Sequence, residues 1–442
     1  MKFTFFIFSL LLAFDIVWAE SYDLNNCLEY ARNNSPEIAE TALNSVQYIS
    51  GRKQAQDARN PKISLLTYGA PMYRITGDAY SYDRDYHVWG PYLHTKMEFQ
   101  MPLYTWGKID SYLKAAEHGI AVAENEKIQK TNDVAYEVKK YYYSLLLART
   151  LKKVVEDVKR ILEEAVSKAQ ELYEKGDGEV KKSDLEKLKV YLGAAEKYQH
   201  EAEKGVTMAR LALMQKMGMS EDEFFDIKDS RLTQDAYKLK TPEFYVDLAL
   251  KKRPEWKMVS SGIKAKTFLV EAEKADRYPV FFLAGEAVYD KAWVVEDQKN
   301  PWLNDSFNNF YGGVAVGAKF DFTPKTTKAK IEAKQAEVDQ LKAKERFARE
   351  GIALQVKNSY YTAIEAAANV VSMKKAADAA DKWVMAAGLT YGIGTGDVKD
   401  ALEGLAARAQ AQKDYYQSIF DYNMAVADLA KNCGLENFTD EK

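Results

Sequence analysis

Residues 391–400 read Y-G-I-G-T-G-D-V-K-D and interrupt a region that otherwise has the pattern of one long helix. Residues 173–182 read Y-E-K-G-D-G-E-V-K-K and are identical to them at five of ten positions. Glycines supply the positive φ angles with which many helices end. The acidic residue that follows, Asp397 or Glu179, favours the N-terminal dipole of a second helix. Both stretches are therefore predicted to be tips of helical hairpins.

The spacing Gly392-x-Gly394-x-Gly396 also suggests a glycine loop that binds phosphate. Such a loop follows a strand and opens a helix. A long helical pattern precedes this one, so the sequence disfavours a nucleotide site.

The two tips are 218 residues apart, and other pairs of short motifs keep this distance. Those pairs are Pro36-Glu37 with Pro254-Glu255, Arg59-x-Pro61 with Arg277-x-Pro279, and Tyr142-Tyr143 with Tyr360-Tyr361. Repeated spacing indicates an internal duplication. We predict a first repeat at 20–218, a polar linker at 219–242, a second repeat at 243–434 and a tail at 435–442.

Each repeat has the same predicted order of elements. A charged helix (25–60 or 243–278) ends at a proline, because proline cannot continue a helix. Two strands follow, then a long helix to the tip, then a closing helix. The first long helix, 108–175, would extend about 100 Å at about 1.5 Å per residue. Helices of this length indicate a coiled coil or a helical barrel.

The N-terminus has the pattern of a secretory signal. Lys2 precedes an apolar run from Phe3 to Phe14, and Ala19 ends a small-residue cleavage site. A signal anchor is the alternative, but the run is short for a bilayer span of about 20 residues. We expect residues 1–19 to be removed.

Composition argues against several classes of protein. The 62 basic and 65 acidic residues leave a net charge of −3, so no nucleic-acid partner is expected. The four histidines have no metal-ligand spacing, and no nucleophile motif is present. We therefore expect no enzyme activity, no metal site and no cofactor.

Four segments have strand character, at about 62–72, 91–103, 279–290 and 310–323. Within 92–101, apolar Leu93, Met97 and Phe99 alternate with polar residues. Residues 311–322 repeat the alternation, which predicts strands with one apolar and one polar face. A soluble sheet packed on helices would also fit this pattern.

A membrane β-barrel has such strands, apolar outside and polar inside. The connections 73–90 and 291–309 are long, polar and rich in aromatic residues, as interfacial girdles are. Four strands cannot close a barrel, since about eight is the minimum, and open edges are not viable in lipid. The barrel would therefore be shared among subunits, and physics alone does not choose between two and three.

At this level the chain resembles the outer-membrane efflux proteins of the TolC type. The matching residues are N-S-P-E (34–37), M-P-L-Y-T-W-G-K-I (101–109), Y-Y-S-L-L-L-A (142–148) and the two tips. The resemblance implies a mainly α-helical homotrimer with a 12-stranded outer-membrane β-barrel, four strands per chain, and a long periplasmic helical barrel. It implies a passive exit duct in a Gram-negative bacterium, for tripartite efflux or type I secretion. Its implied partners are a periplasmic adaptor, an inner-membrane pump and outer-membrane lipid.

The resemblance also assigns roles at the tips. Tyr391, Asp400 and Glu403 match the periplasmic gate, with Lys182 as a further gate candidate. The tip glycines are candidates for adaptor docking: Gly176, Gly178, Gly394 and Gly396. Gly396 stands where members of the family can carry a basic latch residue, so we hypothesise that a Lys182–Asp400 or Lys399–acid contact replaces it.

The two cysteines, Cys27 and Cys433, lie near the ends of the mature chain. An even number in an exported protein permits either a disulfide or two buried thiols. The resemblance brings both chain ends to the middle of the tunnel wall, which favours the disulfide.

Two further points stay open. P-K-T-T-K-A-K-I (324–331) departs from the family pattern and blurs the end of the fourth strand. A coiled-coil structural or adhesion protein without transport activity is the alternative function, although a stalk does not require two strand pairs. The exported substrate, whether drug, metal ion or protein, is not readable from the sequence.

Overall fold

The computed structural model describes residues 21–78, 80–175, 180–392 and 396–438, and the predicted signal peptide (1–19) lies outside them. Six elements occur twice in the same order. The first set is α1 (Leu24–Asn34), α2 (Pro36–Asp57), β2 (Lys62–Asp78), β3 (Ser81–Tyr104), α3 (Lys108–Lys175) and α4 (Lys182–Met217). The second set is α5 (Pro242–Lys252), α6 (Pro254–Ala275), β5 (Val280–Ala292), β6 (Asn309–Lys319), α7 (Pro324–Gly392) and α8 (Val398–Asn432). In each set the first three elements begin 218 residues apart.

The first helix of each repeat is shorter than the sequence predicts. The ranges 25–60 and 243–278 each contain two helices, α1 and α2 or α5 and α6. Ser35 and Arg253 separate them with extended backbone, at ψ of 123° and 125°. Each precedes a proline, whose ring disfavours helical geometry in the preceding residue. The sequence analysis overlooked the break that Pro36 and Pro254 impose.

The chain forms two compact units, which are described separately. The helical unit comprises residues 1–40, 128–253 and 350–442, and the sheet unit comprises 41–127 and 254–349. Helices α3 and α7 contribute residues to both units.

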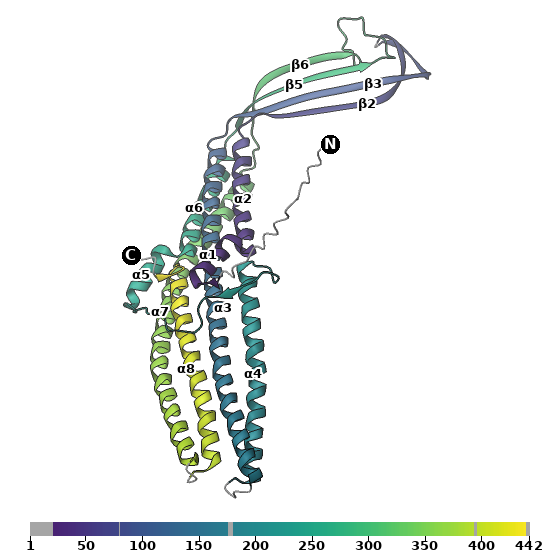
Figure 1. Cartoon of the computed structure of the whole chain (residues 1–442). Coiled ribbons are helices and arrows are strands. Elements are labelled where there is room, and N and C mark those ends of the chain that lie inside the picture. The colour runs from purple at the N-terminus through teal and green to yellow at the C-terminus, as the bar shows by residue number, and fades with distance from the viewer. Residues whose placement is uncertain (1–20, 79, 176–179, 393–395, 439–442) are drawn as a thin grey trace, which may run out of the picture. The chain divides into compact units, whose positions relative to one another are not determined.

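In the helical unit, α3, α4, α7 and α8 lie side by side (Figure 1). Their main hydrophobic core contains fully buried Val138, Tyr142, Leu145 and Leu213. Three of these are positions that the helical periodicity of the sequence predicted to be apolar: Val138, Tyr142 and Leu145. Burial of side chains of this size stabilises the fold by about 1.5–3 kcal/mol each.

The linker between the repeats is part of this core. Phe225, Ile227 and Leu232 are each at most 3% exposed. Two residues of the linker, β4 (Asp226–Ile227), pair in parallel with β1 (Ser21–Tyr22). The linker was expected to be polar, but its few apolar residues attach it to the helices.

In the sheet unit, four antiparallel strands follow the order β2-β3-β5-β6. The two hairpins come from the two repeats and meet where β3 pairs with β5. Strands β2 and β6 are therefore the edges of the sheet.

The strand limits differ from those predicted. Strands β2 and β3 extend through most of 73–90, the stretch predicted to be a loop, with a bulge between Tyr73 and Arg74. Backbone pairing continues as far as Asp78↔Ser81, so only a short turn remains. Strand β6 ends at Lys319, before the predicted 323, and Pro324 begins α7, a position that suits its missing N–H.

The two faces of the sheet differ as the alternation predicts. Leu65, Val314 and Val316 lie on the apolar face with 69%, 67% and 70% of their surface exposed. On the other face, the Lys96 ammonium lies 2.6 Å from Glu98 and 3.3 Å from Glu286. An exposed apolar face of this kind indicates a partner surface or lipid. No helix among the described residues is long and apolar enough to span a membrane.

Candidate functional site

The hairpin tips lie between α3 and α4 and between α7 and α8. Three of the predicted docking glycines, Gly176, Gly178 and Gly394, are outside the described residues. Gly396 is described, and its N–H donates a hydrogen bond to the Thr390 carbonyl at 2.9 Å. A Cβ at this position would lie 2.7 Å from the Tyr391 nitrogen, so the tight end of α7 requires glycine.

Tyr391 connects the second tip to the first. It packs against a hydrophobic cluster that includes Leu185 and Leu188 of α4 and Leu402 of α8. Burial, followed by the charge of the Asp184 carboxylate, raises the pKa of Tyr391. Tyr391 therefore lies between the hairpins with its phenol protonated at neutral pH.

Asp400 and Glu403 both lie exposed in the first turns of α8, but they have different partners. Asp400 Oδ1 accepts a 3.2 Å hydrogen bond from Trp383 Nε1 on α7. Glu403 lies 3.7 Å from Lys399 of the same helix. Asp400 thus ties α8 to α7, whereas Glu403 has only a local ion pair.

The hypothesised replacement latch is not present as an ion pair. Between the described residues Lys182 and Asp400 there is no salt bridge, and Lys182 is exposed. The contact between Lys399 and Glu403 stays within α8, so it cannot hold two helices together. The buried Leu185 and Leu402 are 217 residues apart, one fewer than the tips, which aligns Lys182 in packing with Lys399.

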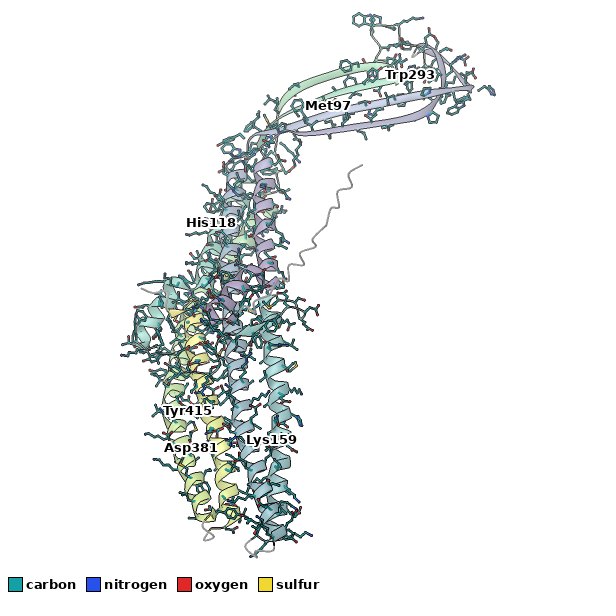
Figure 2. All side chains as sticks on the ribbon, in the orientation of Figure 1. Met97, His118, Lys159, Trp293, Asp381 and Tyr415 are labelled. Atoms are coloured by element: carbon teal, nitrogen blue, oxygen red, sulfur yellow. The ribbon has the colours of Figure 1, made fainter. Side chains whose placement is uncertain are left out.

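Two contacts near the tip were missed in the sequence. Arg408 Nε of α8 donates a 2.6 Å hydrogen bond to Asp381 of α7, which also accepts one from Gln412 at 3.3 Å. Figure 2 labels Asp381 on α7. Asp381 and Arg408 are at nearly equal distances from the tip, a signal that was available in the sequence. Trp383 is closer to the tip than this rule allows and reaches Asp400 through its long side chain.

The structure contradicts the predicted disulfide. Cys27 packs in a cluster with Met217, while Cys433 packs in another with Tyr245. Tyr245 is the repeat equivalent of Cys27, so each cysteine occupies the matching place in its own repeat. The Cys433 thiol donates to the Tyr245 carbonyl at 3.7 Å. Burial, then the nearby charge of Asp23, raises the pKa of Cys27 to about 12.

Metal binding has no support in the part of the chain that the structure describes. No group of three or more histidine, cysteine, aspartate or glutamate side chains there has the geometry to hold a metal ion.

The comparisons with known proteins agree with the duplicated fold. The family model "outer membrane efflux protein" matches residues 27–219. The chain resembles the outer membrane efflux proteins. The sequence match covers the first repeat, and no curated protein matches the chain significantly.

The fold similarity extends to nearly the whole chain. The outer-membrane channel OprN has a TM-score of 0.75 at 16% identity, with 93% of this chain and 89% of OprN covered. CusC has a TM-score of 0.76 at 11% identity, with 94% and 93% covered. The outer membrane protein VceC of Vibrio cholerae has a TM-score of 0.72 at 17% identity, with 93% and 96% covered. At these identities the likeness establishes the shared fold.

Proposed function

We propose that three copies of this chain form a passive exit duct in the outer membrane of a Gram-negative bacterium. The observation that carries the proposal is the four-stranded sheet with one exposed apolar face and two open edges, β2 and β6. Open edges are not viable in lipid. Joining β6 of one copy to β2 of the next closes a barrel of about twelve strands, well above the minimum.

The helices also have faces that another copy would cover. On α7, Leu354, Tyr361 and Val371 are 71%, 60% and 56% exposed. On α4, Val190 and Met208 are 71% and 55% exposed. Contiguous exposed apolar groups mark sites of association. In the trimer, α7 of one copy would pack on α4 of its neighbour and continue the barrel as a helical tunnel in the periplasm.

The duct performs no chemistry of its own. It would receive substrate from an inner-membrane pump through a periplasmic adaptor that docks at the two hairpin tips, Gly176–Gly178 and Gly394–Gly396. Drug efflux and type I secretion both fit such a passive channel, because the pump selects the substrate.

The tips would also form the gate of the duct. Asp400 and Glu403 from three copies would place about six carboxylates around the pore, favouring cations and repelling one another when the tip is tight. The Trp383–Asp400 hydrogen bond and the packing of Tyr391 support a closed tip held by contacts within each chain. Lys182 would contribute positive charge at the same level.

The test is fractionation of cells that express the full chain, followed by native mass spectrometry of the extracted protein. We expect the chain in the outer-membrane fraction, released only by detergent, with the mass of three copies. Recovery from the soluble periplasmic fraction would support the coiled-coil structural alternative and overturn the proposal.

A further inference from the structure

The connection between β5 and β6, residues 293–308, folds back over one end of the sheet. It lies over residues that share a face with the polar Lys96 and Glu286. Cross-strand register places His94 opposite Asp290, two residues beyond the Lys96↔Val288 pair on the same face. Asp290 is 6% exposed and Ala292 is fully buried. This face is therefore covered where the strands meet the loop.

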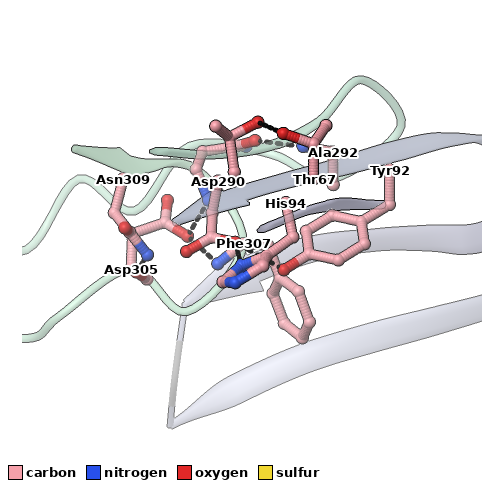
Figure 3. A network of polar contacts seen from close by, with 10 residues as sticks. Thr67, Tyr92, His94, Asp290, Ala292, Asp305, Phe307 and Asn309 are labelled. Carbon is pink, nitrogen blue, oxygen red and sulfur yellow. Dashed lines mark hydrogen bonds and ion pairs between the residues drawn. The ribbon is translucent and has the colours of Figure 1, made fainter. Parts of the chain in front are cut away.

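A polar network holds the base of the loop (Figure 3). Asp290 Oδ1 accepts a hydrogen bond from Tyr92 Oη at 2.6 Å and lies 2.6 Å from His94 Nδ1. Asn309, the first residue of β6, donates from Nδ2 to the Asp305 carbonyl at 2.7 Å. The network joins both hairpins of the sheet to the loop.

Asp305 and Asn308 fix the shape of the loop. The Asp305 carboxylate accepts hydrogen bonds from the backbone N–H groups of Gln298, Phe307 and Asn308, each at 2.8 Å. Asn308 accepts from the Ala292 N–H at 2.7 Å and donates to the Val295 carbonyl at 2.9 Å. Two side chains thus satisfy the backbone of a loop that has almost no regular structure of its own.

The loop also reaches the other hairpin. The Glu296 N–H donates to the Ile75 carbonyl at 2.9 Å, and its carboxylate accepts from the Gly77 N–H at 3.1 Å. Ile75 and Val295 are buried together with Ala292 in a small hydrophobic cluster. The loop is therefore anchored on β2, β3, β5 and β6 and crosses the whole width of the sheet.

We propose that residues 293–308 form a collar that narrows the outer mouth of the duct and limits the size of solutes that pass. The inference rests on the proposed function, because the polar face of the sheet becomes the wall of the lumen only in a closed barrel. A loop fixed on that face then lies inside the mouth, and three copies surround the opening. The fastening by Asp305 and Asn308 makes the collar a constant part of the duct.

The test uses single cysteines in the full-length trimer in intact cells, because the two native cysteines are buried. Glu286→Cys places a thiol on the lumen wall beyond the collar, and Trp302→Cys places one on the collar itself, where Trp302 is 92% exposed. Each is treated with a small cationic methanethiosulfonate or with a maleimide that carries a long polyethylene glycol chain. The bulky reagent reaches Glu286→Cys only through the outer mouth.

We expect both reagents to label Trp302→Cys and only the small one to label Glu286→Cys. Adding Asp305→Ala and Asn308→Ala should raise bulky labelling of Glu286→Cys to the rate seen at Trp302→Cys. The matched control is Asp297→Ala, which removes an exposed loop carboxylate paired with Lys291 and should leave the block intact.

The outcomes separate the collar from the duct. Bulky labelling of Glu286→Cys with the native loop at the Trp302→Cys rate would overturn the collar and leave the duct standing. An unchanged block after Asp305→Ala and Asn308→Ala, with the trimer intact, would overturn the role of these fastenings. Absence of bulky labelling at Trp302→Cys would overturn the proposed outer-membrane location itself.

Discussion

Trp383 Nε1 of α7 donates a 3.2 Å hydrogen bond to Asp400 Oδ1 in the first turn of α8. The bond spans the second hairpin close to its tip, and Gly404 of α8 leaves room for the Trp383 ring, with a Cβ there 3.6 Å from it. The acidic residue matched to a pore gate is therefore held against its own hairpin.

Breaking this bond should loosen the closed tip. Trp383→Phe keeps the ring and removes the N–H, and an exposed hydrogen bond contributes about 0.5 kcal/mol. Summed over three copies, this corresponds to a roughly tenfold shift toward the open state. We expect a higher open probability in bilayer recordings, and the same for Asp400→Ala. Asp414→Asn, whose carboxylate accepts only from Gln410 on the same helix, is the control. Equal behaviour of all three variants would argue against the latch.

The two faces of β6 should tolerate charge differently. Val316 lies on the exposed apolar face, and its neighbour Ala315 lies on the polar face. Val316→Lys should cost about 2–4 kcal/mol per chain in a bilayer, whereas Ala315→Lys would face water. Heat-resistant trimers on electrophoresis should be lost in the first variant and kept in the second. The opposite pattern would mean that the faces are assigned the wrong way round.

Two glycines end α4 and α8 in the left-handed conformation. Gly218 and Gly434 have φ of 80° and 79°, and a Cβ would lie 2.4 Å from the Asn34 carbonyl oxygen or 2.7 Å from Arg253 Cα. Alanine at either position should destabilise the fold by at least about 1–2 kcal/mol from the backbone alone. Gly193→Ala is the control, because its helix has open space there and alanine favours helices. Unfolding temperatures by circular dichroism should fall for the first two and rise slightly for the control.

Glu337 should make the sheet unit sensitive to acid. Hydrogen bonds from Lys266 of α6 and then Lys334 lower its pKa to about 2. A lowered pKa stabilises the fold at pH values above the ordinary 4.5, and this stabilisation is lost as the pH falls from 4.5 toward 2. Wild type should therefore unfold at a higher temperature than Glu337→Gln at pH 6, and the difference should shrink below pH 4.5. A difference independent of pH would contradict this. Glu332→Gln, which removes an exposed pair with Lys328, is the control.

Local chemistry made much of the fold predictable. The glycine tips, the alternation at 92–101 and the long helical stripe ending at Tyr173 each follow from neighbouring residues. Errors arose where a longer-range effect dominates. Pro36 breaks a helix through the conformation of Ser35, and backbone pairing extends β2 and β3 through a stretch of loop-like composition.

The site was less predictable because its contacts join distant helices. Nothing near Asp400 in the sequence indicates Trp383, and the two cysteines fall into separate repeats although their positions near the chain ends suggest a pair. Asp305 and Asn308 read as ordinary loop residues until their backbone partners are known.

Current recording from the detergent-extracted protein in a planar lipid bilayer tests the central claim most directly. We predict discrete conductance steps that favour cations and become larger or more frequent in Asp400→Ala. Membrane insertion without any conductance, in both the native protein and the Asp400→Ala variant, would contradict a duct that three copies of this chain complete.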